Sequence, residues 1–264
     1  VNYQSRSYTL WIVIGILAVA AFLAAQGISL KNPGYVAILR GPSGPEVRVI
    51  NFTQLLTNNS SANAAEYTTA SFTTSPDKLV LAWVITSDTV APTVHVLSSL
   101  HGTWVNIGVT NYDTAGTPLK RVSLWRTMSA TGGTSTLTNK FVGAATGCSF
   151  DVVEFGNVDT SGANGAGAVV PVVMNAADAT ANPSVTLAAL TGTTNAVFCG
   201  FGADVTPFAG TAETDWIEQF DSGYSAPNTG CYATYRIETT DNTVVVTRAA
   251  VDWGGIAVEI KAKP

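Results

Sequence analysis

Charged side chains are scarce in this chain. Asp, Glu, Lys and Arg together make up 12% of its 264 residues, against about 25% in typical soluble domains. Acidic residues outnumber basic ones by 18 to 13, which gives a formal net charge of −5. Proteins bind nucleic acid mainly through Lys and Arg side chains that neutralise phosphates. The sequence therefore predicts no nucleic-acid partner.

Residues that carry catalysis or hold metals are also few. The chain has two histidines, His95 and His101, and no carboxylates stand near them in the sequence as a metal site would require. No Gly-x-Ser-x-Gly motif is present. The glycine-rich stretch 162–167 lacks the Lys and Ser/Thr of a phosphate-binding loop. We therefore predict a non-enzymatic protein without a resident cofactor, in which both histidines are structural.

Acidic residues offer only weak site candidates. Asp151 and Glu154 are three residues apart in a strand-like run, so they face opposite sides of a sheet and do not form an acid/base pair. A second group, Glu213, Asp215 and Glu218, lies in an expected loop. Calcium could bind there or at Asp159, but a solvated loop is the leading interpretation.

Three cysteines, Cys148, Cys199 and Cys231, lie in strand-like segments at spacings that match no zinc pattern. We expect them to be small buried apolar side chains. One disulfide plus a free thiol is the alternative, and it requires an oxidising compartment.

The one long apolar run is YTLWIVIGILAVAAFLAA, residues 8–25, which carries no charge. Its length suits a helix that crosses a bilayer, and we predict a single transmembrane helix over residues 8–30 after a short flank, residues 1–7. Four small residues near one stripe, Gly15, Ala18, Ala21 and Ala25, would let another helix approach closely. The expected partners are lipids and other transmembrane proteins. Few lysines, abundant threonines and three N-x-S/T sequons favour an extracytoplasmic β domain.

The rest of the chain alternates short apolar runs with Gly, Asn, Asp and Thr turns. We predict a juxtamembrane hairpin and polar linker over residues 31–66, then a β-sandwich domain over residues 67–264. About a dozen short strands indicate an all-β, jelly-roll-like antiparallel sandwich. The length suits one large sandwich or two small ones. The sequence shows no repeat of fixed period.

The order of six segments resembles a loose group of mostly uncharacterised bacterial and phage proteins: KLVLAWVIT, TWVNIGV, RVSLWRTMSA, CSFDVVEFGNVDTSGANGAG, PSVTLAAL and AVDWGGIAVEIKA. The resemblance spans about residues 67–262, and WGGIAVEIK is its most specific part. It implies a jelly-roll or lectin-like sandwich in a virion or surface protein. The group has no agreed active site, so no functional residue carries over.

Six tryptophans could contribute to a sugar-stacking surface. Trp83 and Trp125 lie within apolar runs and are expected in the core. Trp104, Trp216 and Trp253 lie near turns or glycines and are the candidates for a glycan-binding surface, with core packing as the competing interpretation.

These features favour a membrane-anchored structural or accessory subunit. Its helix would dock against partner helices, and its β domain would stabilise a larger membrane assembly, for example a bioenergetic or photosynthetic supercomplex. A carbohydrate-binding or adhesive protein of a phage or cell surface is the first alternative. A pilin-like filament subunit is the second.

Overall fold

A computed structural model of the chain describes residues 49–88, 95–116 and 118–264, which form an all-β fold. The elements are β1 (Asn51–Ser60), β2 (Ala64–Thr68), β3 (Phe72–Thr74), β4 (Leu79–Asp88), β5 (His95–Ser99), β6 (Val105–Tyr112), β7 (Leu119–Thr127), β8 (Gly133–Ser135), β9 (Leu137–Ala145), β10 (Gly147–Gly156), the 3-10 turn η1 (Ala163–Gly165), β11 (Val169–Thr180), β12 (Ser184–Thr186), β13 (Ala196–Ala203), β14 (Thr211–Ala212), β15 (Ile217–Tyr224), β16 (Thr229–Ile237), β17 (Thr243–Thr247) and β18 (Val251–Ile260).

The predicted transmembrane helix over residues 8–30 lies outside the described residues, as does its stripe of Gly15, Ala18, Ala21 and Ala25. Within the part of the chain that the structure describes, no helix has the length and apolar character needed to cross a bilayer.

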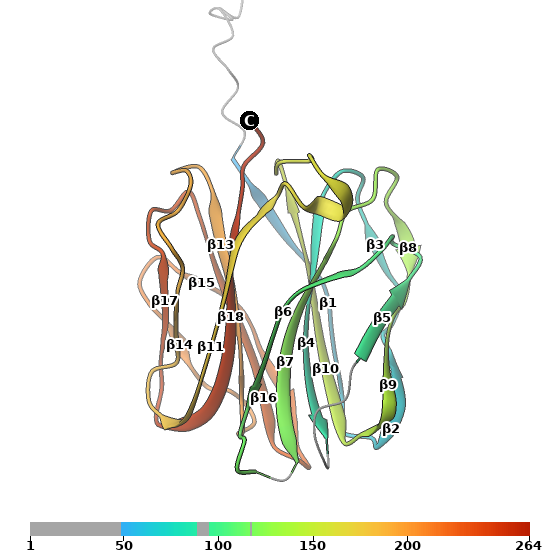
Figure 1. The fold of residues 1–264 in the computed structure, drawn as a ribbon, viewed down its shortest axis with the longest axis vertical. Helices are drawn as coiled ribbons and strands as arrows, with labels where there is room; N and C mark the ends of the chain where they lie inside the picture. Colours follow the sequence, from blue (N-terminus) through green and yellow to red (C-terminus); the bar gives the residue numbers. More distant parts are fainter. Residues whose placement is uncertain (1–48, 89–94, 117) are drawn as a thin grey trace, which may run out of the picture. The chain divides into compact units, whose positions relative to one another are not determined.

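Two five-stranded antiparallel sheets form the centre of the fold. Their strand orders are β1-β10-β4-β7-β6 and β11-β18-β13-β16-β15. A three-stranded sheet, β2-β9-β5, covers the outer face of the first, and another, β12-β17-β14, covers the outer face of the second. Figure 1 shows these four layers side by side, with β14 and β17 at one side and β2, β5 and β9 at the other. A short pair, β3-β8, adds to the first half.

The two halves of the chain have the same strand order. We call β1–β10 the first half and β11–β18 the second half. The inner sheets have the same strand order when their strands are matched in chain order, β1, β4, β6, β7 and β10 with β11, β13, β15, β16 and β18. The strand orders of the outer sheets match in the same way. Register irregularities recur on matched edge strands: β6 and β15 each carry one, β1 carries one and β11 carries two. The structure therefore contains a repeat that the sequence does not display as a period.

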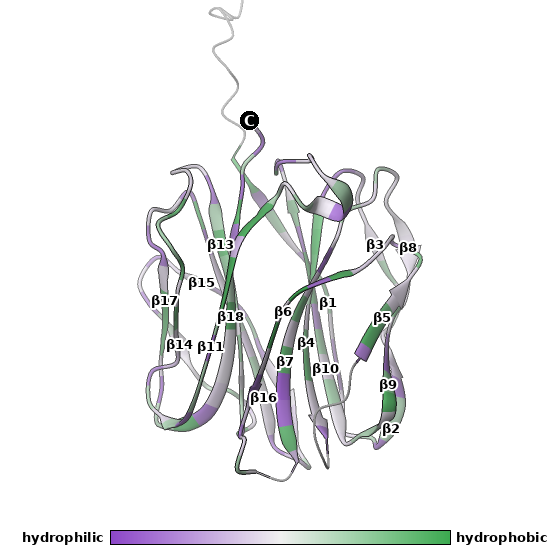
Figure 2. Ribbon diagram, viewed as in Figure 1, coloured by the Kyte–Doolittle hydropathy of each residue, from purple (hydrophilic) through white to green (hydrophobic). Residues whose placement is uncertain are grey.

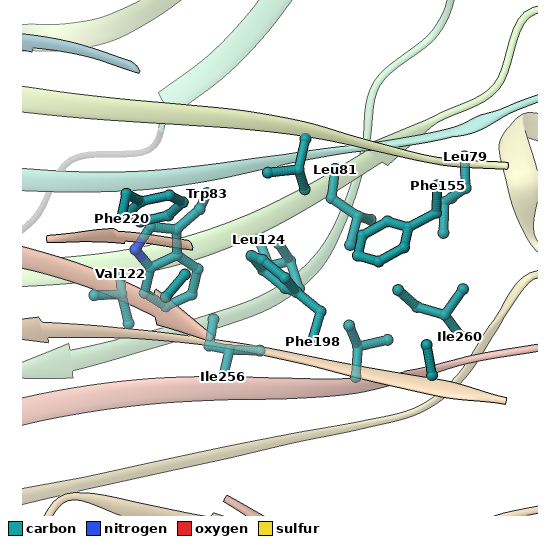
Figure 3. Packing of buried hydrophobic residues seen from close by; sticks show 14 of the residues in the cluster. Leu79, Leu81, Trp83, Val122, Leu124, Phe155, Phe198, Phe220, Ile256 and Ile260 are labelled. Atoms are coloured by element: carbon teal, nitrogen blue, oxygen red, sulfur yellow. The ribbon is translucent and has the colours of Figure 1, made fainter. Parts of the chain in front are cut away.

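The inner faces of the two five-stranded sheets pack against each other to form the central core. Leu79, Leu81 and Trp83 enter it from β4, and Ile256 and Ile260 enter it from β18. Figure 3 shows these side chains meeting between two layers of ribbon, with Leu124 close to Phe198. Because β4 and β13 are covered on both faces, every one of their residues is buried, which explains their nearly continuous apolar sequences.

In the central core, Trp83 of the first half packs against Gly200 of the second half. Trp83 pairs with Asp151 across β4 and β10, and the matched pair in the second half is Gly200 with Ile256. A Cβ atom on Gly200 would lie 2.5 Å from the Trp83 ring. The absent side chain at Gly200 therefore makes the space that the buried indole occupies.

One prediction about local structure is wrong, and another holds only in part. A juxtamembrane hairpin and polar linker were expected over residues 31–66. Residues 31–48 lie outside the described residues, and most of the rest belong to β1 and β2, of which β1 pairs with β10 along its length. The strand lies at the edge of its sheet with many exposed side chains, so it lacks the apolar alternation that marks a half-buried strand. The loop expected at Glu213, Asp215 and Glu218 is confirmed for residues 213–216, but Glu218 lies in β15.

Candidate functional site

The three tryptophans proposed as a glycan-binding surface are buried, which corrects that prediction. Trp104, Trp216 and Trp253 are 8%, 7% and 2% exposed. Trp104 packs in the core beneath β2-β9-β5, and the other two pack beneath β12-β17-β14. Although they lie near turns or glycines, these rings are not on the surface, because each packs into a core that an outer sheet covers.

The three cysteines are buried and free, as their sequence context predicted. Burial raises the pKa of the thiols of Cys148, Cys199 and Cys231. They are neutral at physiological pH and poor nucleophiles, because the thiolate is the reactive form.

Both histidines are buried and hydrogen-bonded. His95 Nε2 lies 2.7 Å from Ser123 Oγ. His101 Nε2 lies 3.1 Å from the Phe72 carbonyl oxygen, and its ring stacks on the Phe72 ring at 4.2 Å. Burial lowers the pKa of His101, so this ring is neutral at pH 7. These contacts fit the structural role predicted for both residues.

Among the described residues, no group of three His, Cys, Asp or Glu side chains is arranged to hold a metal ion. Asp215 pairs with Arg236 at 3.4 Å. Asp159 accepts a hydrogen bond from the Ser161 backbone N–H at 2.8 Å, and its bonds to Ser161 lower its pKa. These carboxylates are therefore held by protein groups.

Two buried glutamates occupy matched positions in the two halves. Glu154 pairs with Val80, and Glu259 pairs with Val197, across equivalent strands. Glu154 accepts hydrogen bonds from the Ser75 backbone N–H at 2.6 Å and from Lys78 Nζ at 2.9 Å.

Glu259 makes the corresponding contacts in the second half. It accepts hydrogen bonds from the Thr191 backbone N–H at 2.7 Å and from Asn195 Nδ2 at 2.6 Å. Each glutamate thus fixes the segment that enters the central strand of its half, β4 or β13. The role is structural, because these bonds tie each carboxylate to its own chain. Both oxygens of Glu154 accept hydrogen bonds, whereas Glu259 accepts them through Oε1.

A third buried carboxylate, Asp151, has no counterpart in the second half, where Ile256 takes its place. Asp151 is fully buried in the central region, and Cys231 Sγ donates a hydrogen bond to its Oδ2 at 2.8 Å. Burial raises the pKa of Asp151 to about 7, against hydrogen bonds from Cys231 and Thr57 that lower it. Asp151 and Glu154 point to opposite faces of β10, as predicted.

A hollow of about 260 Å³ lies on the outer side of the first half, where the inner sheet extends beyond the outer one. His95 from β5, Asn106 and Val109 from β6, and Arg121 and Trp125 from β7 line it. Val122 and Leu124 on β7 point into the central core, so the alternation of the strand places Arg121 and Trp125 on the opposite face.

Trp125 is held in a fixed orientation at this hollow. Its Nε1 donates a hydrogen bond to Ser123 Oγ at 3.0 Å, and the buried His95 ring lies 5.5 Å from the indole. Arg121 Nε donates to Asn111 Oδ1 at 3.1 Å. Trp125 was expected in the core, but it is only half-buried. The alternation of side chains in the segment RVSLWRT was the signal that could have predicted this. Val122 and Leu124 face the core, so Trp125 faces the other side of the strand.

The matched face of the second half is covered by its own chain. Phe208, between β13 and β14, stacks on Tyr232 of β16 at 5.0 Å, and Arg248 lies 4.7 Å from the Phe208 ring centre. The backbone N–H groups of Phe208 and Ala209 donate to Asp221 of β15. Tyr232 occupies the position in the second half that Ser123 occupies in the first, because Tyr232 pairs with Asp221 and Ser123 pairs with Val109 on the matched strands. The second half therefore places a phenylalanine near the position at which the first half has the hollow.

Apolar side chains are also exposed on the outer sheet of the first half. Val96 on β5 is 58% exposed, Val142 on β9 is 87% exposed, and Leu100 just beyond β5 is 89% exposed. Val96 pairs with Lys140, so Val142 is its diagonal neighbour on the same face. Figure 2 shows apolar stretches along both β5 and β9. We call Val96, Leu100 and Val142 the outer apolar group.

Comparison with known proteins returned no match among family models, curated proteins or solved structures.

Proposed function

We propose that this chain is a non-enzymatic structural subunit of a larger membrane assembly. Its β domain acts by contact with another protein of that assembly, and the segment over residues 8–30 anchors it in the bilayer. The observation that carries the proposal is the outer apolar group on the outermost sheet of the first half.

The exposure of these side chains supports a protein contact. Burying an apolar side chain is favourable by roughly 1.5–3 kcal/mol, so a partner that covers these exposed side chains gains free energy from each of them. Val96 and Val142 are exposed on two paired strands, β5 and β9.

We also propose that each half is a jelly roll. Each half has eight strands in two sheets, if the additional pair β3-β8 is set aside. Numbered within a half, the strands of the inner sheet run 1-8-3-6-5 and those of the outer sheet run 2-7-4. Eight strands folded into two antiparallel sheets are the architecture of virion and lectin jelly rolls, which agrees with the resemblance found in the sequence.

The anchor rests on the sequence. Residues 8–25 contain no charge, and their length suits the hydrocarbon thickness of a bilayer. The stripe of Gly15, Ala18, Ala21 and Ala25 offers a partner helix a close approach. The β domain and the helix would then contact the same assembly at two places, and two linked contacts raise the effective affinity without a new interface.

The test uses the full chain, extracted from its membrane in mild detergent and separated by blue-native electrophoresis. We expect the wild-type chain to migrate with a large complex. The double variant Leu100→Asp, Val142→Asp should migrate as a smaller species, because a charge cannot be buried in the contact without a partner.

The matched control is Ile217→Asp. Ile217 is 51% exposed on β15 of the second half, so this variant adds a charge at an apolar surface position away from the outer apolar group. It should remain in the complex. Migration of the wild-type chain only as a free monomer, or equal retention of the double variant and the control, would overturn the proposal.

A further inference from the structure

We propose that the hollow between β5, β6 and β7 binds a single pyranose ring of a neutral glycan, with Trp125 as the platform on which the sugar stacks. This inference does not depend on the proposed contact through the outer apolar group.

The first argument is the state of the Trp125 ring. Ligand sites combine apolar or aromatic surface with a few fixed polar groups. The Trp125 indole is half-buried, and its N–H is already bonded to Ser123 Oγ at 3.0 Å. The ring is therefore fixed before a ligand arrives, which lowers the entropy cost of binding. The apolar C–H face of a sugar ring complements an indole, which presents an apolar body with a polar tip.

The second argument is the polar lining around that ring. Asn106 pairs with Trp125 across β6 and β7, and Asn111 pairs with Arg121. Amide and guanidinium groups donate hydrogen bonds in fixed directions, which suits the hydroxyl groups at the edge of a sugar. The Arg121 side chain is oriented by its bond to Asn111 at 3.1 Å. These polar side chains come from two paired strands, so their spacing is set by the sheet.

The size and charge of the hollow define the ligand. A volume of about 260 Å³ lies just below the range of roughly 300–1,000 Å³ for sites that enclose drug-sized ligands, so it suits one ring with the rest of the glycan outside. The hollow is lined by one cation, Arg121, and Asp88 acts electrostatically on it. This balance favours a neutral sugar over one that carries a carboxylate.

The second half supplies an internal comparison. Phe208 stacks on Tyr232 near the matched position and is fully buried. An aromatic ring from the chain itself thus occupies the region that we assign to a sugar in the first half.

The experiment measures binding of the full chain to soluble glycans in octaethylene glycol monododecyl ether, a detergent without a sugar headgroup. The probes are a printed array of neutral and sialylated oligosaccharides, followed by titration of the methyl glycosides of glucose, galactose, mannose and N-acetylglucosamine. We expect neutral glycans to bind. Trp125→Ala should weaken the best of them at least about tenfold, which corresponds to about 1.4 kcal/mol.

Three further variants make the result specific. Trp125→Phe should retain part of the affinity because it keeps a ring, and Asn106→Ala should weaken binding about threefold to tenfold at an exposed position where folding is not at risk. Val142→Ala, outside the hollow on the same half, should bind as the wild type does. No binding by the wild type, binding of sialylated glycans only, or equal affinity of the wild type and Trp125→Ala would overturn the proposal.

Discussion

The first and second halves of this protein share a strand topology and differ in the side chains at particular positions. Their inner and outer sheets have the same strand orders, their edge strands β6 and β15 carry register irregularities at matched places, and each half uses a buried glutamate to fix the segment before its central strand. The differences lie at three places: Trp83 faces Gly200, Asp151 stands where the other half has Ile256, and the Trp125 hollow lies where the other half has Phe208.

This comparison separates the residues that specify the fold from those that specialise each half. A feature present in both halves, such as the glutamate at 154 and 259, serves the shared architecture. A feature present in one half is free to serve packing or binding. The predictions below test that separation, from the largest expected effect on stability to the smallest.

The strongest test removes the ring that joins the halves. Trp83→Ala should lower the free energy of unfolding by about 3–5 kcal/mol, because it leaves a cavity in the central core. Gly200→Ala should lower it by about 1–3 kcal/mol through overpacking against the ring. In the Trp83→Ala background the same Gly200→Ala change should cost little. Chemical denaturation of the four proteins gives the coupling energy, and additive effects would contradict the proposed fit.

Asp151 should make stability depend on pH. Its pKa is about 7 in the folded chain, against 3.8 for an ordinary aspartate. The folded state therefore keeps a proton that the unfolded state loses between these values, so stability should fall as the pH rises from about 4 to 7 and stay low above that. The penalty at pH 8 is up to about 4 kcal/mol.

The check compares Asp151→Asn with the wild type. The stability difference between the two proteins should shift in favour of the variant as the pH rises from 4 to 8, because an amide does not titrate. Parallel pH profiles for the two proteins would show that Asp151 is not responsible.

The matched glutamates should respond alike to substitution but differently to salt. Glu154→Gln and Glu259→Gln should each lower the free energy of unfolding by about 1–3 kcal/mol, because each leaves a backbone or side-chain donor poorly paired. Only Glu154 bonds a cation, Lys78. Added salt should therefore shrink the effect of substitution at Glu154 and leave the effect at Glu259 unchanged.

The control is the exposed Glu66, which pairs with Lys140 at 3.5 Å. Its substitution should change the free energy of unfolding by less than about 0.5 kcal/mol.

The smallest effect on stability is expected on the outer apolar group. Leu100→Ser and Val142→Ser should change the free energy of unfolding by no more than about 0.5 kcal/mol, because both side chains are exposed. Thermal unfolding of the chain in sugar-free detergent gives the measurement. A loss of several kcal/mol would show that these side chains serve the fold instead of a partner.

Much of the fold is readable from the sequence, because the central strands are long apolar runs. The segments LVLAWVITSD and AVFCGFGA are buried on both faces and form β4 and β13. β1 was missed because an edge strand needs few apolar residues, and its sequence NFTQLLTNNS resembles a polar linker. β15 was missed because its acidic start suggested a solvated loop.

The repeat could not be found from periodicity, since few matched positions keep the same residue. The clearest trace is VVEF at residues 152–155 against AVEI at residues 257–260, aligned through Glu154 and Glu259. A repeat that survives in backbone topology leaves a weak mark on composition. The hollow was missed for another reason: Trp125 lies in an apolar segment, and only its parity relative to Val122 and Leu124 places it on the outer face.

The shared central core has a consequence for how the chain is made. During synthesis the first half leaves the ribosome complete, with Leu81, Trp83 and Leu124 on a face that only the second half can cover. At a synthesis rate of about 5–20 residues per second, that apolar face stays exposed for on the order of ten seconds before the second half is complete. Truncation before β11 should therefore yield an aggregating product, and a chaperone that shields apolar sheet surfaces should raise the yield of the intact chain.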